Sequence, residues 1–297
     1  MGTFLFFRYN KANGTIDRLL KQKGGTSMHT LSSPAPHSNI RRERKAGKKP
    51  SLLKRMSGAI LSLILLLAAV WAIIGYIGEQ WMDQKKLAVF TQPSAQTYIP
   101  TDEMPDYVWQ AFIAIEDHRF PYHPGVDPIA IGRSIWIDLS TDSKAQGAST
   151  ITMQLARNLF LSHDKTIERK LKETAIAIRL EQQYSKQELL TMYLNTIYFG
   201  HGTYGIEKAA DFYFGKTVRE NGQKHTITLS EAALLASLPK APESYSPVKH
   251  LEKAKKRQAL VLKRMVDLGF ITEAEKENAL KKEIVLQPAT RTYVNAS

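Results

Sequence analysis

The chain of 297 residues contains no cysteine. That absence excludes disulfide bonds, thiolate metal sites, iron–sulfur clusters and a cysteine nucleophile, although it leaves the redox compartment open. Acidic residues are also few, with 28 Asp and Glu against 41 Lys and Arg, so the formal net charge is +13. Such an excess would indicate a nucleic-acid-binding protein only if it covered the folded part of the chain.

The positive charge is concentrated at the N-terminus. Residues 1–57 hold thirteen basic residues and only two acidic ones, Asp17 and Glu43, so they account for eleven of the thirteen net charges. The rest of the chain is nearly neutral, which removes the argument for nucleic acid as a partner. Because residues 1–57 lack a sustained hydrophobic period and are interrupted by glycine and proline, we predict a basic, disordered cytoplasmic tail there.

One long apolar run follows this tail. Residues 58–78, GAILSLILLLAAVWAIIGYIG, contain no charge. A helix of this length spans a hydrocarbon core of about 30 Å, so the run predicts a transmembrane helix. A cleaved signal peptide is the alternative, but its apolar region would be shorter, about 7–15 residues, and would end at a small-residue cleavage pattern that is missing here. The basic residues before the run place the N-terminus inside and the chain after residue 78 outside.

Helix signals dominate the remainder, which we divide into a connector, residues 79–100, and one extracytoplasmic domain, residues 101–297. An apolar face at i, i+3, i+4 and i+7 from Val108 predicts a helix that ends near Asp117. Capping boxes, in which Ser or Thr precedes Glu by three residues, predict further helices after Ser185, Thr228 and Thr272. The predicted fold class is mainly α.

Ionisable residues gather in the segment 116–134, EDHRFPYHPGVDPIAIGRS. Taken alone, its carboxylates could belong to a solvated loop. The segment resembles the first signature of the peptidoglycan glycosyltransferases, glycosyltransferase family 51, which reads Glu-Asp-x-x-Phe-x-x-His-x-Gly-x-Asp. The positions that match are Glu116, Asp117, Phe120, His123, Gly125 and Asp127.

Four further blocks resemble the other motifs of this family in the same order. They are residues 147–158 (GASTITMQLARN), 169–173 (RKLKE), 193–216 and 229–247, and the resemblance covers roughly residues 95–270. Small departures are Ala148 for a usual Gly, Met153 for a usual Gln and Arg157 for a usual Lys. The resemblance implies a lysozyme-like, two-lobed helical domain beside the membrane. Since the chain ends soon after the fifth block, it implies a monofunctional enzyme without a transpeptidase domain.

The activity that the resemblance implies is the polymerisation of lipid II. The 4-hydroxyl of one unit attacks the anomeric carbon of the growing chain and expels undecaprenyl diphosphate with inversion. A carboxylate base must accept the hydroxyl proton, and the resemblance assigns this role to Glu116, with His123 as the alternative. It makes Glu173 the second catalytic carboxylate, although Arg169 and Glu173 could simply form a surface pair at i, i+4.

Cations are expected at the leaving diphosphate, because its negative charge grows in the transition state. The residues that the resemblance assigns there are Arg157, Lys165 and Lys172. Positioning of the substrate is assigned to Asp117, Phe120, His123, Ser149, Thr150, Gln154, Asn158 and Tyr198. We expect no required cofactor and no protein-held metal, although Mg²⁺ or Mn²⁺ could bridge diphosphate oxygens.

Two other functions compete with this prediction. A lysozyme-like cell-wall hydrolase would use the same carboxylates on water, and a catalytically silent membrane scaffold would keep only the fold. The expected partners are lipid II, the growing glycan chain, the lipid bilayer and other cell-wall synthesis proteins, at the bacterial cytoplasmic membrane. The apolar stretch 129–139 around Trp136 fits either a membrane-facing surface or ordinary core packing.

Overall fold

The computed structural model describes residues 52–91, 98–140, 148–162, 164, 166–220 and 224–287. The chain divides after Ser51, and the unit that begins at Leu52 contains all of these residues. Residues 1–51 of the predicted tail and the predicted diphosphate ligand Lys165 lie outside the described residues.

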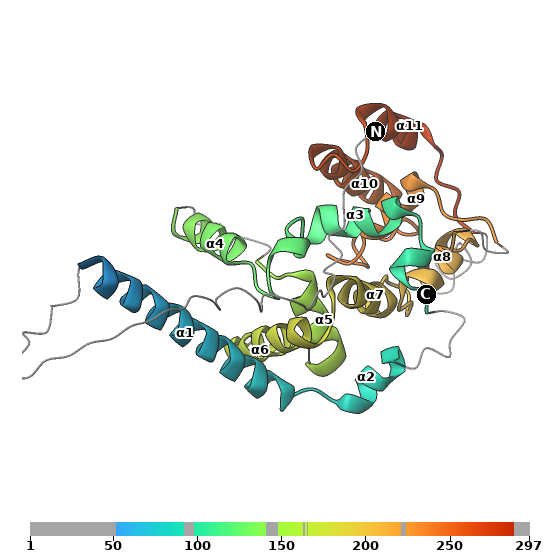
Figure 1. Ribbon diagram of the computed structural model, residues 1–297. Helices are drawn as coiled ribbons and strands as arrows, with labels where there is room; N and C mark the ends of the chain where they lie inside the picture. The colour runs from blue at the N-terminus through green and yellow to red at the C-terminus, as the bar shows by residue number, and fades with distance from the viewer. Residues whose placement is uncertain are drawn as a thin grey trace, which may run out of the picture. The chain divides into compact units, whose positions relative to one another are not determined.

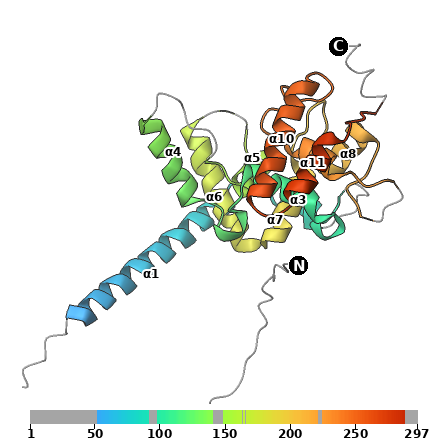
Figure 2. The same ribbon diagram turned by 90° about the horizontal axis from the view of Figure 1, so that it is seen from above.

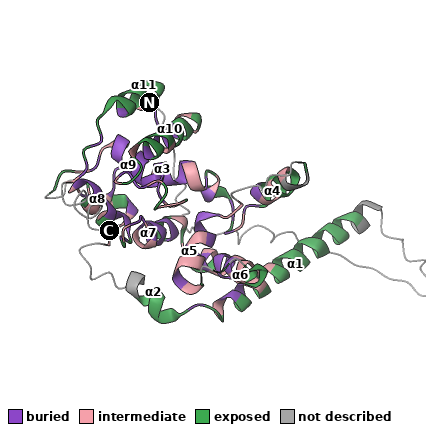
Figure 3. Ribbon diagram, turned by 180° about the vertical axis from the view of Figure 1, so that it is seen from behind, coloured by how far each residue is buried: buried purple, intermediate pink, exposed green. Residues whose placement is uncertain are grey.

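The first helix, α1 (Leu52–Glu79), occupies the position of the predicted transmembrane segment. Its stretch Met56–Glu79 is long and apolar enough to cross a membrane, and only 6% of its most apolar window is buried inside the protein. Large apolar residues such as Leu61 and Leu65 are exposed on it, and Figure 3 colours most of the helix as exposed. Such a surface is unfavourable in water and suits a hydrocarbon environment.

Within the described residues the chain forms helices and no strands, apart from isolated bridges between Tyr198 and Tyr204 and between Thr217 and Thr226. The mainly α prediction is therefore confirmed. The remaining α-helices are α2 (Gln84–Thr91), α3 (Asp106–Glu116), α4 (Pro128–Ser140), α5 (Ile151–Phe160), α6 (Ile167–Gln183), α7 (Lys186–Thr196), α8 (Ile206–Phe214), α9 (Leu229–Ala236), α10 (Leu251–Asp267) and α11 (Glu273–Lys281), and the 3-10 helices are η1 (Thr101–Glu103) and η2 (Phe120–Tyr122).

These helices pack in two groups around one continuous core (Figures 1 and 2). One group contains α3, α9, α10 and α11, and the other contains α5, α6 and α7, with α1 against α6. α8 contacts both α7 and α9. Phe112 of α3 meets Phe199, which follows α7, edge to face with ring centroids 6.0 Å apart. The helical groups agree with the expected two lobes.

Local sequence signals determine where several helices begin. Ser185, Thr228 and Thr272 each cap a helix with the complete capping box that the sequence predicts, at the starts of α7, α9 and α11. Each box satisfies backbone N–H groups that the first helical turn leaves unpaired. The predicted connector also contributes to the domain, because Met82, Leu87 and other side chains before Thr101 are buried in the core.

Candidate active site

Glu116 is the last residue of α3, where the two helical groups meet. Its Oε2 accepts a hydrogen bond of 2.9 Å from Nε2 of Gln154 on α5. The Oε1 atom of the same Gln154 accepts one of 3.2 Å from the hydroxyl of Tyr193 on α7. Because Tyr193 is fully buried, these two hydrogen bonds fix the orientation of the Gln154 amide group. Glu116 of α3 is half-buried and is oriented by residues of α5 and α7, which belong to the other group of helices.

Burial raises the pKa of Glu116 above the usual range of a glutamate. The hydrogen bond from Gln154 and the positive charges of Arg257, Lys240 and Arg157 oppose this rise without cancelling it. A carboxylate with a raised pKa is a stronger proton acceptor than an exposed one, provided that it stays ionised at the working pH. The environment of Glu116 therefore suits a general base.

Asp117 follows Glu116 but plays a different part. Its buried carboxylate lies 2.9 and 3.0 Å from Nε2 of His123 and accepts a hydrogen bond of 3.0 Å from the backbone N–H of Ile151, the first residue of α5. The carboxylate therefore ties the end of α3 to the start of α5. His123 is buried beside it, and this favours a supporting role for His123 over the alternative in which it acts as the base.

We expect Asp117→Asn to destabilise the fold. Both oxygens of Asp117 accept hydrogen bonds in a buried site, and the amide group replaces one acceptor with a donor. Leaving a buried donor unpaired costs about 1–3 kcal/mol, which chemical unfolding of the purified protein measures. Asp102→Asn, at an exposed carboxylate of η1, is the matched control. Equal free energies of unfolding for the two variants would contradict this role.

The second carboxylate, Glu173, lies on α6 and is fully buried. Its Oε1 accepts a hydrogen bond of 2.6 Å from Nζ of Lys170, and its Oε2 pairs with Arg169. Lys170 also donates to Oγ of Ser149 at 2.7 Å. The predicted pair of Arg169 and Glu173 is present, but it is not a surface pair, since the carboxylate is shielded from solvent. Glu173 thus orients two cations in the first half of α6.

Of the three cations predicted for the diphosphate, Lys165 lies outside the described residues, and the other two, Arg157 and Lys172, have different surroundings. Arg157, in the last turn of α5, is half-buried and close enough to Glu116 to lower its pKa. Lys172 instead pairs with Glu168 at 2.7 Å and stands over the ring of Trp81 at 5.6 Å. On a helix the neighbours of Glu173 are the residues three and four positions away. Lys170 therefore pairs with Glu173, whereas Lys172 does not, and the diphosphate-binding role of Lys172 stays a prediction.

Two of the predicted positioning residues support the local fold. Thr150 caps α5, because its hydroxyl accepts from the Met153 N–H and donates to the Gly125 carbonyl at 2.6 Å. Phe120 is buried, and the ammonium group of Lys186 lies 4.4 Å from its ring centroid. The substrate-positioning roles of Thr150 and Phe120 stay predictions.

Asn158 and Tyr198 are the other two predicted positioning residues. Asn158 is half-buried in the last turn of α5. The hydroxyl of Tyr198 donates to Oε1 of Glu243 at 3.0 Å, and its ring tilts against Tyr204 with centroids 4.8 Å apart. Tyr198 thus connects the fourth sequence block with the fifth.

Sequence reasoning missed the basic residues that reach Glu116 from the C-terminal part of the chain. Lys240 and Arg257 both lower the pKa of Glu116. Arg257 is fixed by its hydrogen bond of 2.8 Å to the Ser237 carbonyl and by the ring of Tyr245, 4.9 Å away. Both lie in or just after the fifth block, but only tertiary packing brings them to the first.

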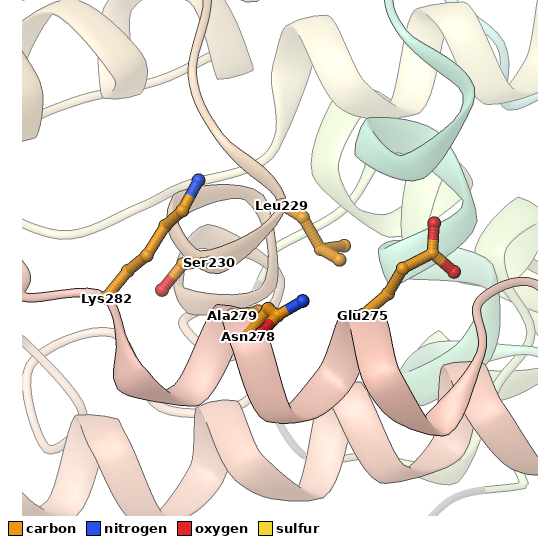
Figure 4. Close-up of a pocket in the computed structure, with 6 residues that line it drawn as sticks. All are labelled: Leu229, Ser230, Glu275, Asn278, Ala279 and Lys282. Atoms are coloured by element: carbon orange, nitrogen blue, oxygen red, sulfur yellow. The ribbon is translucent and has the colours of Figure 1, made fainter.

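No group of three or more His, Asp or Glu side chains that could hold a metal occurs in the part of the chain that the structure describes. The expectation about Mg²⁺ or Mn²⁺ therefore stays a prediction. A small pocket of about 180 Å³ lies between the start of α9 and α11 (Figure 4). Neither Glu116 nor Glu173 lines it. The residues that line it are Leu229, Ser230, Glu275, Asn278, Ala279 and Lys282.

The fold and the site define a helical domain with two carboxylates and several cations, preceded by a long apolar helix. Such groups are typical of an enzyme in which a carboxylate accepts a proton and cations stabilise negative charge in the transition state. The chain belongs to the transglycosylase family, whose profile matches residues 83–266.

Proteins with similar sequences support this family assignment. The chain is 43% identical over 243 residues to penicillin-binding protein 1F of Bacillus subtilis, covering 75% of this chain and 33% of the relative. It is 46% identical over 190 residues to penicillin-binding protein 1A of Aquifex aeolicus, covering 64% of this chain and 25% of the relative. A Cupriavidus necator protein provisionally assigned as a transglycosylase is 40% identical over 236 residues, with 80% of this chain and 95% of that protein covered.

The chain spans a quarter to a third of the length of these two penicillin-binding proteins. The crystal structure of penicillin-binding protein 1A from Haemophilus influenzae matches the present structure with 25% sequence identity and a TM-score of 0.37. The match covers 64% of this chain and 18% of the Haemophilus influenzae chain.

Proposed function

We propose that this protein is a peptidoglycan glycosyltransferase that polymerises lipid II into glycan strands and releases undecaprenyl diphosphate. The observation that carries the proposal is the environment of Glu116, a half-buried carboxylate with a raised pKa beside the cations of the site. Membership of the transglycosylase family supplies the substrate class. The alignments cover 33% and 25% of the two penicillin-binding relatives but 95% of the Cupriavidus necator relative, so the proposal concerns the glycosyltransferase activity alone.

In the proposed reaction Glu116 takes the proton from the 4-hydroxyl of the acceptor sugar as the oxygen attacks the anomeric carbon. The bond from that carbon to the diphosphate oxygen breaks on the opposite face, so the configuration inverts. The leaving group departs as an anion. Because the proton passes to Glu116 and the electron pair to the diphosphate, the step needs no redox partner.

The cations of α6 and α5 are proposed to stabilise the departing diphosphate. Glu173 holds Arg169 and Lys170 in place, and Arg157 approaches from α5. Charges fixed in this way favour the transition state because they need no reorganisation when negative charge develops. Mg²⁺ or Mn²⁺ held by the diphosphate oxygens themselves would add to this stabilisation.

The site is proposed to work at the outer face of the bacterial cytoplasmic membrane. The chain would be a single-pass protein, with α1 in the bilayer, the N-terminus inside and the domain outside, as the basic residues before the span favour. Its partners would be lipid II, the growing glycan chain and the bilayer, together with other cell-wall synthesis proteins.

The acidic limb of the pH–rate profile tests the proposed base. Glu116 must be ionised to accept a proton, so kcat/KM should fall as the pH drops through its pKa, which burial places above the ordinary glutamate value. Lys240 lowers this pKa, and Lys240→Gln should therefore move the limb to higher pH. Lys255→Gln, at an exposed residue of α10, is the control and should leave the limb in place. A limb that Lys240→Gln does not move would count against Glu116 as the base.

One experiment separates transfer from hydrolysis. The full-length protein is incubated in parallel with labelled lipid II and with purified sacculi. A glycosyltransferase converts lipid II into long chains and leaves sacculi intact. Release of soluble fragments from sacculi without growth of chains would replace the proposal with the hydrolase alternative, and inactivity on both would favour the scaffold.

A further inference from the structure

Helix α6 carries residues of the candidate active site and also contacts the apolar helix α1. Its first half carries Arg169, Lys170 and Glu173, and α1 packs against it (Figure 1). The backbone of α1 at Gly78 comes close to the backbone of Ala175, only two residues after Glu173. Any movement of α1 on α6 therefore acts within one helical turn of the second carboxylate.

A glycine at position 78 allows this approach, whereas Gly75 faces only the movable end of the Gln182 side chain. A Cβ atom on Gly78 would stand 2.2 Å from the carbonyl oxygen of Ala175, and one on Gly75 would stand 2.3 Å from Oε1 of Gln182. Helices can pack this closely only where small residues leave room for the backbone of the neighbour. Gly58, near the other end of α1, has nothing within 4 Å of the same position. Glycine is therefore needed only near the end of α1 that contacts α6. We call this part, residues 75–79, the docked end.

Polar contacts secure the same end of α1. The carboxylate of Glu79, the last residue of α1, forms an ion pair of 2.7 Å with Arg179 of α6. A few residues later, Nζ of Lys86 donates a hydrogen bond of 2.7 Å to the carbonyl of Leu159 near the end of α5. The apolar helix α1 is therefore joined to α6, and the helix that follows it, α2, is joined to the end of α5.

We propose that the docked end of α1 is a positioning element that sets the depth of the active-site cations relative to the bilayer. The inference rests on the proposed function, because a prenyl-linked substrate presents its diphosphate at the level of the lipid headgroups. Cations that receive this group must be held at that level. Gly78, Glu79 and Arg179 are positioning residues in this arrangement, since they act through α6 and touch no substrate.

The first test compares Gly78→Leu with the matched control Gly58→Leu in the full-length protein. With lipid II in vesicles, Gly78→Leu should lower kcat/KM at least about tenfold, since misplacement by about an ångström can cost more. With a short-tailed, water-soluble lipid II analogue the loss should be less than about threefold, because that substrate can adjust its depth. Gly58→Leu should match the wild type on both substrates.

Equal losses on both substrates would mean that Gly78→Leu damages the site itself and would overturn the inference, as would no loss on either. A charge exchange at the ion pair gives an independent check that does not crowd α6. Glu79→Arg and Arg179→Glu should each lower the rate on vesicle-bound lipid II, and the double exchange should restore most of it. A double variant no better than the single ones would overturn the inference.

A spectroscopic measurement separates the inference from the proposed function. The chain has no cysteine, so spin labels on Ile64→Cys and Lys255→Cys report the distance between α1 and α10 in nanodiscs without background. We expect one narrow distribution, which Gly78→Leu broadens. A broad distribution in the otherwise unchanged protein would overturn the docking, whatever the activity. A narrow one in a protein that makes no polymer would leave the docking intact and count against the proposed function.

Discussion

Glu116→Gln is expected to lower the rate of lipid II polymerisation by about 10²–10⁴-fold, the usual contribution of a general base. The glutamine side chain has nearly the same shape, and its carbonyl oxygen can still accept the hydrogen bond that Gln154 donates to Glu116. It cannot take up the proton of the attacking hydroxyl. The loss should therefore appear in the chemical step, with little change in substrate binding.

The same substitution should not destabilise the fold. Since burial raises the pKa of Glu116, the protonated carboxyl is favoured in the folded state and its stabilising effect is lost as the pH rises through that pKa. At neutral pH the ionised group opposes folding, so the free energy of unfolding of Glu116→Gln should equal or exceed that of the wild type. Glu252→Gln, at an exposed position on α10, is the control for activity. A Glu116→Gln protein that unfolds more easily would mean that its inactivity reports misfolding.

Glu173→Gln is expected to reduce both activity and stability. The fully buried carboxylate receives Lys170 and pairs with Arg169, and a neutral amide leaves these cations without their counter-charge. Losing their fixed orientation should cost about 10²–10³-fold in rate, as removal of one transition-state-stabilising group does. Breaking the buried hydrogen bonds should lower the free energy of unfolding by about 1–3 kcal/mol.

Glu168→Gln provides the matched control on the same helix. Glu168 pairs with Lys172 through a carboxylate that is 77% exposed, and exposed pairs contribute little to stability. The control should keep the wild-type rate and unfolding curve. If both variants behaved like the wild type, the buried cluster of Glu173, Lys170 and Arg169 would have no role in the reaction.

Several features of the fold could be predicted because they depend on neighbouring residues only. The uncharged run predicts α1, and each capping box predicts the start of a helix from four consecutive residues. The end of α3 beside Glu116 follows from the apolar period of that helix. Helical spacing also accounts for the pairing of Lys170 with Glu173, since i, i+3 residues share a face.

Other features depend on tertiary packing and could not be predicted. Lys240 and Arg257 reach Glu116 from more than 120 residues away, and no local pattern signals this approach. The apolar stretch of α4 left two interpretations open, because periodicity shows that a face is apolar but not what covers it. The structure leaves Trp136 72% exposed and Ile135 54% exposed. Ordinary core packing is therefore wrong for these residues.

The central claim is that this protein joins lipid II units into glycan strands. Its most direct test is a gel of the products that the full-length wild type forms from labelled lipid II in detergent with divalent cation, before and after digestion with a muramidase. We expect long chains that the muramidase shortens, with undecaprenyl diphosphate released as they grow. Absence of chains, under conditions in which another transglycosylase makes them, would contradict the account.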